Sequence, residues 1–262
     1  MLKFCSLYSS STGNSLLVQS ENTNIIVDAG VSGKKIIEAL SSVDVCIESI
    51  QAIIVTHEHT DHTLSLATLS KKYNIPIYAN DKTWSVLKQD KIASCNKKLF
   101  TPYESFEIGD LEILPFRIPH DAIDPCGFNI SNNGTKISIA TDLGYIDSKI
   151  FSHLKNSSFV LLESNYDPEV LKCCSYPFSL KQRISGPTGH LSNNSAGQVI
   201  CELYNHGLKS AMLGHLSKES NFPELAYHTV ADALQSNNIS KDNLCLKVAS
   251  RLEPSELLCI EA

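Results

Sequence analysis

The residues most able to do chemistry lie in one short run, VTHEHTDH at positions 55–62. His57 and His59 are two positions apart, and Asp61 and His62 follow directly after them. Imidazole and carboxylate groups are good ligands for Zn²⁺ and related divalent ions, and these four groups exceed what one ion needs. A solvated polar loop would explain a lone His-x-His. The apolar stretch AIIV before this run favours a metal-binding turn at the end of a strand.

Polar residues of the same types end several other apolar stretches. Asp28 follows NIIV, Asp142 follows ISIAT, and His120 and His215 end LEILPFRIPH and KSAMLGH. Side chains at the carboxyl ends of neighbouring strands share one rim, on backbone that packing holds rigid. We therefore expect residues far apart in the sequence to form a single site with His57.

Strand-like and helix-like patterns alternate along the chain and predict a mixed α/β fold in one domain, residues 1–262, with no disordered linker and no repeat period. The turn Asn132–Gly134 predicts a hairpin. Predicted strands are 14–20, 23–30, 51–57, 75–81, 111–120, 135–142, 158–164 and 209–215. Predicted helices are 32–42, 63–73, 82–90, 192–206 and 223–236.

The bulk composition restricts the environment in which the protein works. A hydrophobic fraction of 42% with 19% charged residues is typical of a soluble globular protein, and no apolar run approaches the roughly 20 residues of a membrane span. The N-terminal stretch MLKFCSLYSSSTG lacks the layout of a secretion signal, and the nine cysteines form no Cys-x-x-Cys pair. These features predict reduced thiols in a cytoplasmic protein with no membrane partner. The net charge of −6 means that any attraction for an anionic substrate must be local.

In its ordered motifs the chain resembles the metallo-β-lactamase-fold hydrolases. Their signature is an Asp after an early strand, then His-x-His-x-Asp-His, a His, an Asp and a final His, and here it spans Asp28 to His215. The resemblance implies a four-layer αββα sandwich with two metal ions at one edge. Many members have glycine shortly after Asp-His, where this chain reads DHTLS with Ser65. That departure affects the start of the next helix and removes no ligand.

The resemblance also implies a role for each residue of the signature. One ion would be held by His57, His59 and His120, and the other by Asp61, His62 and His215. Asp142 would bridge the ions, and Asp28 would orient the histidine loop from behind. Asp61 is in addition a candidate catalytic residue. Within the superfamily the chain is most similar to the YycJ-type group of cytosolic DNA exonucleases, through STGNS, PHDAIDPCGF, ATDLG, LLESNYD, LKQRISGPTGHLSN and GHLSKESN.

The tetrapeptide Gly-His-Leu-Ser occurs twice, and we expect the two copies to have different roles. His215 follows an apolar strand pattern, as a metal ligand should, whereas His190 lies in a loop whose Ser192 is a plausible helix N-cap. Helix-start histidines assist the leaving group in the related tRNA-processing hydrolases. By that resemblance His190 donates a proton to the departing oxygen. The alternative for His190 is a structural hydrogen bond.

The segment around His190 offers candidate contacts for an anionic substrate. From Leu171 to Cys201 there is no Asp or Glu, and Lys181 and Arg183 are natural contacts for phosphate. Ser192 and the amides of the helix behind it could hold another phosphate oxygen. Tyr176 and Phe178 could stack on nucleobases. A solvated basic loop and plain aromatic packing remain the alternatives.

The site itself leaves the substrate open, because paired metal ions hydrolyse lactams, thioesters and phosphodiesters alike. We expect a phosphodiesterase, specifically a DNA exonuclease that uses a metal-bound hydroxide. The alternatives are a hydrolase of thioesters, lactones or cyclic phosphodiesters, and a non-enzymatic metal-binding or regulatory protein. The ligand set accepts Zn²⁺, which we expect first, and also Mn²⁺ or Fe²⁺. An activity comparison of DNA, RNA and small esters would separate the hydrolases.

Overall fold

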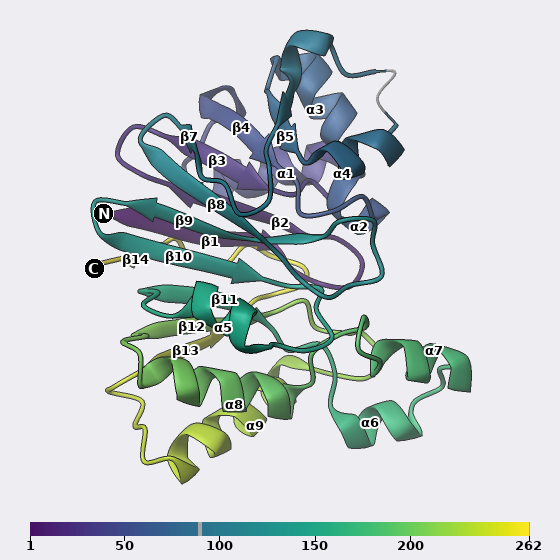
Figure 1. Ribbon diagram of the computed structural model, residues 1–262, viewed down its shortest axis with the longest axis vertical. Coiled ribbons are helices and arrows are strands. Elements are labelled where there is room, and N and C mark those ends of the chain that lie inside the picture. Colours follow the sequence, from purple (N-terminus) through teal and green to yellow (C-terminus); the bar gives the residue numbers. More distant parts are fainter. Residues whose placement is uncertain (89–90, 262) are drawn as a thin grey trace.

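The computed structural model describes residues 1–88 and 91–261, and two seven-stranded sheets form the centre of this part of the chain (Figure 1). The strands of the first sheet are β1 (Leu2–Tyr8), β2 (Ser15–Gln19), β3 (Asn24–Val27), β4 (Ile50–Ile54), β5 (Ile77–Ala79), β6 (Lys97–Leu99) and β14 (Leu258–Ile260). Their order in the sheet is β14-β1-β2-β3-β4-β5-β6. Pairing is antiparallel from β14 to β3 and parallel from β3 to β6.

The second sheet divides in the same way. Its strands are β7 (Phe106–Ile108), β8 (Leu111–Arg117), β9 (Cys126–Asn132), β10 (Thr135–Ala140), β11 (Phe159–Glu163), β12 (Ser210–Gly214) and β13 (Cys245–Val248). Their order is β13-β12-β11-β10-β9-β8-β7, parallel from β13 to β10 and antiparallel from β10 to β7. The predicted hairpin joins β9 to β10, where Asn133 and Gly134 both have the positive φ that such tight turns need.

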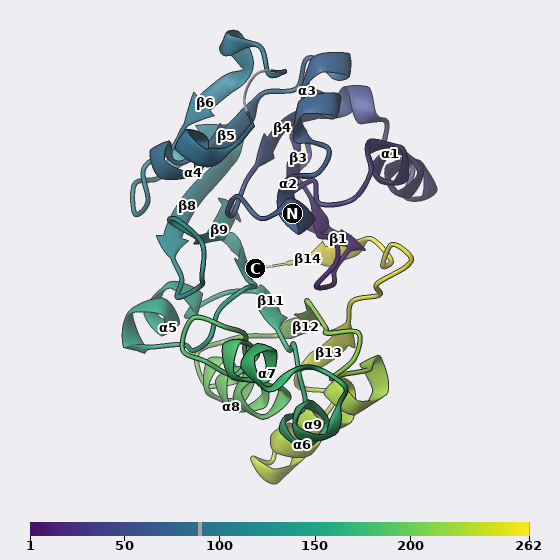
Figure 2. The same ribbon diagram turned by 90° about the vertical axis from the view of Figure 1, so that its right-hand side faces the viewer.

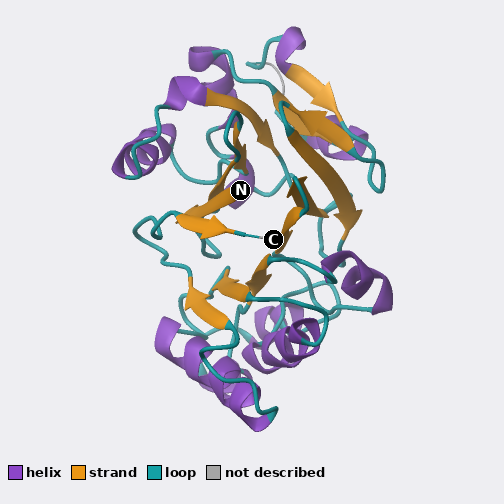
Figure 3. Ribbon diagram, turned by 90° about the vertical axis from the view of Figure 1, so that its left-hand side faces the viewer, coloured by secondary structure: helices purple, strands orange, loops and turns teal. Residues whose placement is uncertain are grey.

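Helices cover the outer faces of both sheets (Figures 2 and 3). The α-helices of the described residues are α1 (Gly33–Ser42), α2 (Thr60–Thr63), α3 (Leu66–Tyr73), α4 (Asp81–Val86), α5 (Ser148–Leu154), α6 (Pro168–Cys173), α7 (Phe178–Ile184), α8 (Asn193–Tyr204) and α9 (Pro223–Ser236). The predicted helix 82–90 runs past α4 into positions 89 and 90, which lie outside the described residues. No helix of the described chain has the length and hydropathy to cross a membrane.

Three apolar clusters join the layers. One packs α1 and α3 on the first sheet, for example Ile36 with Ile53, and another packs α8 and α9 on the second sheet. The third fills the space between the sheets, where the rings of Phe4 and Phe159 lie 4.6 Å apart. The strand β11 serves two clusters because its side chains alternate between faces; Leu161 enters the inter-sheet cluster and Leu162 the helix-facing one. Three interfaces between four layers make the αββα sandwich that the resemblance implies.

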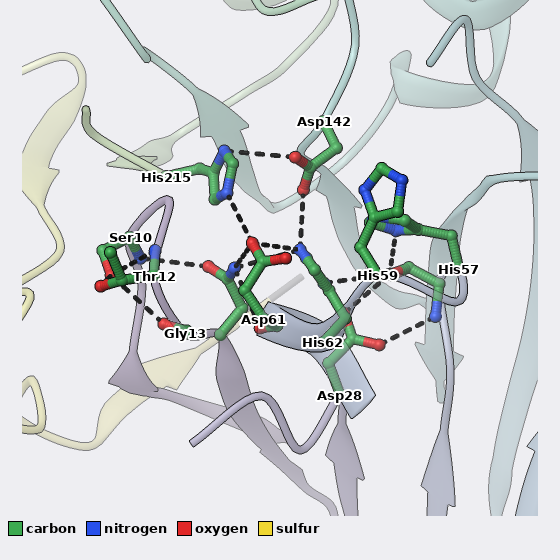
Figure 4. Close-up of polar contacts among 12 residues, drawn as sticks. Ser10, Thr12, Gly13, Asp28, His57, His59, Asp61, His62, Asp142 and His215 are labelled. Carbon is green, nitrogen blue, oxygen red and sulfur yellow. Dashed lines mark hydrogen bonds and ion pairs between the residues drawn. The ribbon is translucent and has the colours of Figure 1, made fainter. Parts of the chain in front are cut away.

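The parallel strands of both sheets bring the polar strand-end residues to one edge. Asp28 follows β3, Asp142 lies two residues after β10, and His215 follows β12. All three have left-handed backbone, with φ of 62°, 61° and 55°. Residues other than glycine rarely adopt this conformation, and where they do it is commonly at a functional site. At the rim the side chains of Asp142 and His215 face each other, and Asp28 lies behind His62 (Figure 4).

Candidate metal centre

The HEHTDH loop runs from β4 to α2 and is held from behind by one carboxylate. Asp28 is buried; its Oδ1 accepts the Thr56 amide hydrogen at 2.9 Å, and its Oδ2 accepts the Thr56 hydroxyl at 2.8 Å. The same Oδ2 lies 2.7 Å from Nδ1 of His62 (Figure 4). A carboxylate can only accept, so Nδ1 of His62 carries the hydrogen and Nε2 is left to face the site.

The first predicted set of three ligands is brought together. His57, His59 and His120 each offer a ring nitrogen, and these atoms lie within 4.8 Å of one another. The ring centroids of His57 and His59 are 4.6 Å apart, and those of His57 and His120 are 5.1 Å apart. Nδ1 of His120 lies 3.2 Å from the Gly189 carbonyl oxygen, which fixes the ring. His57 and His120 are buried, and His59 is half-buried.

The second predicted set lies beside the first. Atoms of Asp61, His62 and His215 fall within 4.8 Å of one another, and Oδ2 of Asp61 is 3.4 Å from His62 Nε2 and 3.7 Å from His215 Nε2. Asp142 faces both sets: its Oδ2 is 3.1 Å from His62 Nε2, and its Oδ1 is 3.7 Å from His120 Nε2. The structure therefore places Asp142 between the two sets.

Several atoms at the centre lack the partners that buried polar atoms need. Nε2 of His57 and Nε2 of His215 are buried without a hydrogen bond, and the 3.1 Å contact of Asp142 Oδ2 lacks hydrogen-bond geometry. Leaving such atoms unsatisfied costs about 1–3 kcal/mol each. Burial would raise the pKa of Asp142, but His215 and His62 lower it well below its usual value, so the carboxylate is ionised. Unsatisfied nitrogens around an ionised carboxylate fit the binding of divalent cations.

Glu163, the last residue of β11, is a functional candidate that the sequence analysis missed. It is fully buried, and its Oε1 lies 2.8 Å from Nδ1 of both His190 and His215. Its Oε2 accepts the amide hydrogens of Leu143 and Leu191, each at 3.0 Å. The available signal was its position at the end of an apolar strand, which it shares with Asp28 and Asp142.

The two Gly-His-Leu-Ser copies run on either side of the segment after Glu163. The backbone amide of Asn165 donates to the Leu191 carbonyl, and the backbone amide of Ser217 donates to the Asn165 carbonyl, each at 2.8 Å. The side-chain amide of Asn165 donates to the His215 carbonyl, also at 2.8 Å. The buried amides of Asn193 and Asn221 hydrogen-bond each other. His190 and His215 lie in different sequence contexts, but both donate to Glu163 Oε1, and hydrogen bonds of Asn165 support both of their loops.

A third loop, residues 10–14 after β1, reaches the second set of ligands. The backbone amide of Asn14 donates to the Asp61 carbonyl at 2.8 Å, and its side-chain nitrogen lies 3.1 Å from His62 Nε2 and 3.5 Å from Asp61 Oδ2. A Cβ on Gly30 would lie 1.6 Å from the Asp61 carbonyl oxygen. Only glycine therefore allows this close packing behind Asp61.

With this geometry in view, comparison with known proteins decides the family. Residues 23–215 match the model of the beta-lactamase superfamily domain, which is well over half of the chain. The chain belongs to this superfamily. Exodeoxyribonuclease WalJ of Streptococcus pneumoniae is 36% identical over 236 residues, covering 88% of each chain, and exodeoxyribonuclease YycJ of Bacillus anthracis is 35% identical, covering 89% of each.

A solved structure supports the fold of this superfamily member over nearly its full length. The metallo-beta-lactamase fold protein YhfI of Bacillus subtilis superposes with a TM-score of 0.72 at 16% identity, covering 97% of this chain and 98% of that one. The predicted family and fold are thus confirmed. Ser65, which stands near the position where many members have glycine, is buried, and its hydroxyl donates to the Ala29 carbonyl at 3.1 Å. The helix α3 begins directly after it.

Of the three predicted substrate contacts, Arg183 lines the cavity over the metal ligands, and Lys181 and Ser192 are not among the residues that line it. Arg183 lines a cavity of about 450 Å³ over the histidines and pairs with Asp121, Nε to Oδ2 at 2.5 Å. Lys181 lies in a separate hollow and donates to the Lys172 carbonyl, because it occupies another face of α7. Ser192 is buried and accepts the Ser195 amide hydrogen as the predicted N-cap of α8, so its hydroxyl is already engaged.

Proposed function

We propose that this protein is a metal-dependent phosphodiesterase that degrades DNA from an end. The observation that carries the proposal is the pair of adjoining ligand sets with Asp142 between them. Two relatives of nearly the same length, at 35–36% identity, are named exodeoxyribonucleases, which supports DNA as the substrate. When bound, a pair of divalent ions activates water and stabilises the oxygens of a phosphoryl displacement.

The ligand assignment follows the two sets of side chains. One ion would be held by His57, His59 and His120, the other by Asp61, His62 and His215, and Asp142 would bridge them. Asp28 fixes the hydrogen of His62 on Nδ1 and so directs Nε2 into the site. Zn²⁺ is the ion we expect first, and Mn²⁺ or Fe²⁺ suit the same nitrogens and oxygens.

His190 is proposed to protonate the leaving oxygen. It lines the cavity, and because its Nδ1 donates to Glu163, its Nε2 remains for the substrate. Burial opposes a charge on His190, but the Glu163 carboxylate raises its pKa above the ordinary histidine value. A histidine that keeps its proton near neutral pH can act as a general acid. Asp61, which also lines the cavity, would be a ligand of the second ion and a catalytic residue beside the reacting water.

Arg183 is the chain's phosphate contact in this proposal. Its side chain lines the cavity and is more than half exposed, and a guanidinium can bind phosphate through two parallel hydrogen bonds. The setting is proposed to be the reducing cytoplasm, in line with nine cysteines that are all free.

A substrate comparison tests the proposal. Purified protein is stripped of metal with a chelator, reloaded with Zn²⁺ or Mn²⁺, and given end-labelled DNA, RNA of the same sequence, a thioester, a lactone and a cyclic phosphodiester. We expect metal-dependent shortening of DNA from an end, with much slower turnover of the small esters. Rapid hydrolysis of a small ester without DNA degradation would establish the small-molecule alternative instead.

A further inference from the structure

The helix α7 has two different faces, and only one of them belongs to the metal site. Leu180, Arg183 and Ile184 line the cavity over the histidines, as their spacing of three and four residues on a helix requires. Phe178 and Lys181 line a separate hollow of about 410 Å³. Figure 1 shows α6 and α7 at the right-hand edge, on the same side as α2.

The cavity wall formed by α7 is apolar apart from Arg183. Tyr176, just before the helix, continues this wall and is half-buried, as is Leu180, while Ile184 is buried. The loops after β1 and β12 add Thr12, Ser217 and Lys218 to the lining of the same cavity. A ligand in this cavity therefore meets hydrocarbon and a phenol ring from α7 and the segment before it, and polar residues from these two loops.

We propose that the α7 wall is the subsite for the base of the terminal nucleotide, with Tyr176 as its stacking surface. The inference rests on the proposed function, since it requires DNA as the substrate. A volume of about 450 Å³ lies in the range of pockets for small ligands, about 300–1,000 Å³, which suits a nucleotide unit. Arg183 lies on the same wall, beside His120 through its partner Asp121, where it can hold the phosphate of that unit.

The residues that line the cavity make a nucleobase a better occupant than an acyl chain. A base presents a flat apolar face and a polar edge, and it is joined to an anionic phosphate. The cavity offers a phenol ring, a guanidinium from the helix that follows it, and polar groups from other loops. Because stacking depends on the face of the base and not on its hydrogen-bonding edge, this subsite accepts every base.

The experiment compares two sets of short single-stranded DNA substrates with the metal-loaded protein. One set has a normal nucleotide at both ends, and the other has abasic residues there. Base–aromatic stacking contributes about 1–3 kcal/mol, so the wild type should prefer the normal ends roughly 5–150-fold in kcat/KM. Tyr176→Ala should bring that preference close to one, because the normal ends lose their stacking partner and the abasic ends have no base to stack.

Two further variants act as controls. Tyr176→Phe keeps an aromatic ring and should keep the preference. Phe178→Ala removes an aromatic side chain that is 73% exposed and lies outside the metal cavity, and it should also keep the preference. The inference is overturned if Tyr176→Ala slows both substrates equally, or if Phe178→Ala abolishes the preference. A wild type that degrades neither substrate defeats the proposed function, and the subsite with it.

Discussion

Replacing Glu163 by Gln tests the shared carboxylate at the end of β11. Four hydrogens converge on its two oxygens, from the rings of His190 and His215 and from the amides of Leu143 and Leu191. Glutamine has nearly the same shape but only one oxygen. In one orientation of the amide, its NH₂ group faces the two imidazoles, and in the other it faces the two backbone amides. In either case two buried donors lose their acceptor.

The cost follows from that count. A buried donor without an acceptor costs about 1–3 kcal/mol, so the substitution should lower the free energy of unfolding by about 2–6 kcal/mol. The imidazoles could avoid the conflict by moving their hydrogen from Nδ1 to Nε2. For His215 that change would place a hydrogen on the atom that points at Asp61, and would weaken metal binding instead. Either stability or metal affinity must therefore fall.

Urea denaturation of the metal-free protein and a metal-binding titration measure the two quantities. The rate on DNA adds a third signature. Loss of the carboxylate lowers the pKa of His190, so the decline in rate as pH rises through that pKa should begin at a lower pH in the variant. Glu163→Asp, which keeps the charge on a shorter side chain, is the matched control. Wild-type stability, metal affinity and pH profile in Glu163→Gln would refute this account of Glu163.

The remaining predictions concern the two histidines and the basic segment. His190→Ala should retain both metal ions and lose about 10²–10⁴-fold in turnover of DNA, yet recover much of its rate on a nitrophenyl phosphodiester, whose leaving group needs little protonation. His215→Ala should lose metal and activity on both substrates; metal loss in His190→Ala would show that the roles are reversed. Arg183→Ala should reduce the salt slope of DNA binding by about 0.7–0.9 for one lost phosphate contact, and Lys181→Ala, matched in charge, should change it less. Equal slopes in wild type and Arg183→Ala would remove Arg183 from the substrate path.

The sequence predicted the central strands and the rim well because local patterns determine both. Apolar runs such as those ending at Asp28 and Asp142 are buried on both faces, so they stand out without any knowledge of the fold. The strands β1, β6, β7, β13 and β14 were missed because they lie at or near sheet edges, where apolar character is weaker, or, for β1, among serines and a cysteine. The strand β9 was expected only as the first arm of the hairpin at Asn132–Gly134, without bounds of its own. That residues 1–262 form one domain stays a prediction, supported by an inter-sheet cluster that includes Leu2 and Ile260.

The residues of the site were easier to predict from the sequence than the contacts that those residues make. Sequence spacing suggested Lys181 and Arg183 as a pair, but a helix turns about 100° per residue, so two residues apart they face different hollows. Glu163 carries no motif of its own, and its role depends on two loops that return to it from 27 and 52 positions away. Such convergence is a property of the tertiary fold.

DNA hydrolysis by this protein should depend on two ions held around Asp142. Metal-free protein is titrated with Zn²⁺ or Mn²⁺ while bound metal and the degradation of end-labelled DNA are measured in the same samples, for wild type and Asp142→Ala. The account predicts that the wild type binds two ions per chain and that its nuclease activity rises with their binding. Asp142→Ala should lose occupancy and activity together. Two tightly bound ions with undiminished DNA degradation in Asp142→Ala, or full activity in metal-free wild type, would contradict it.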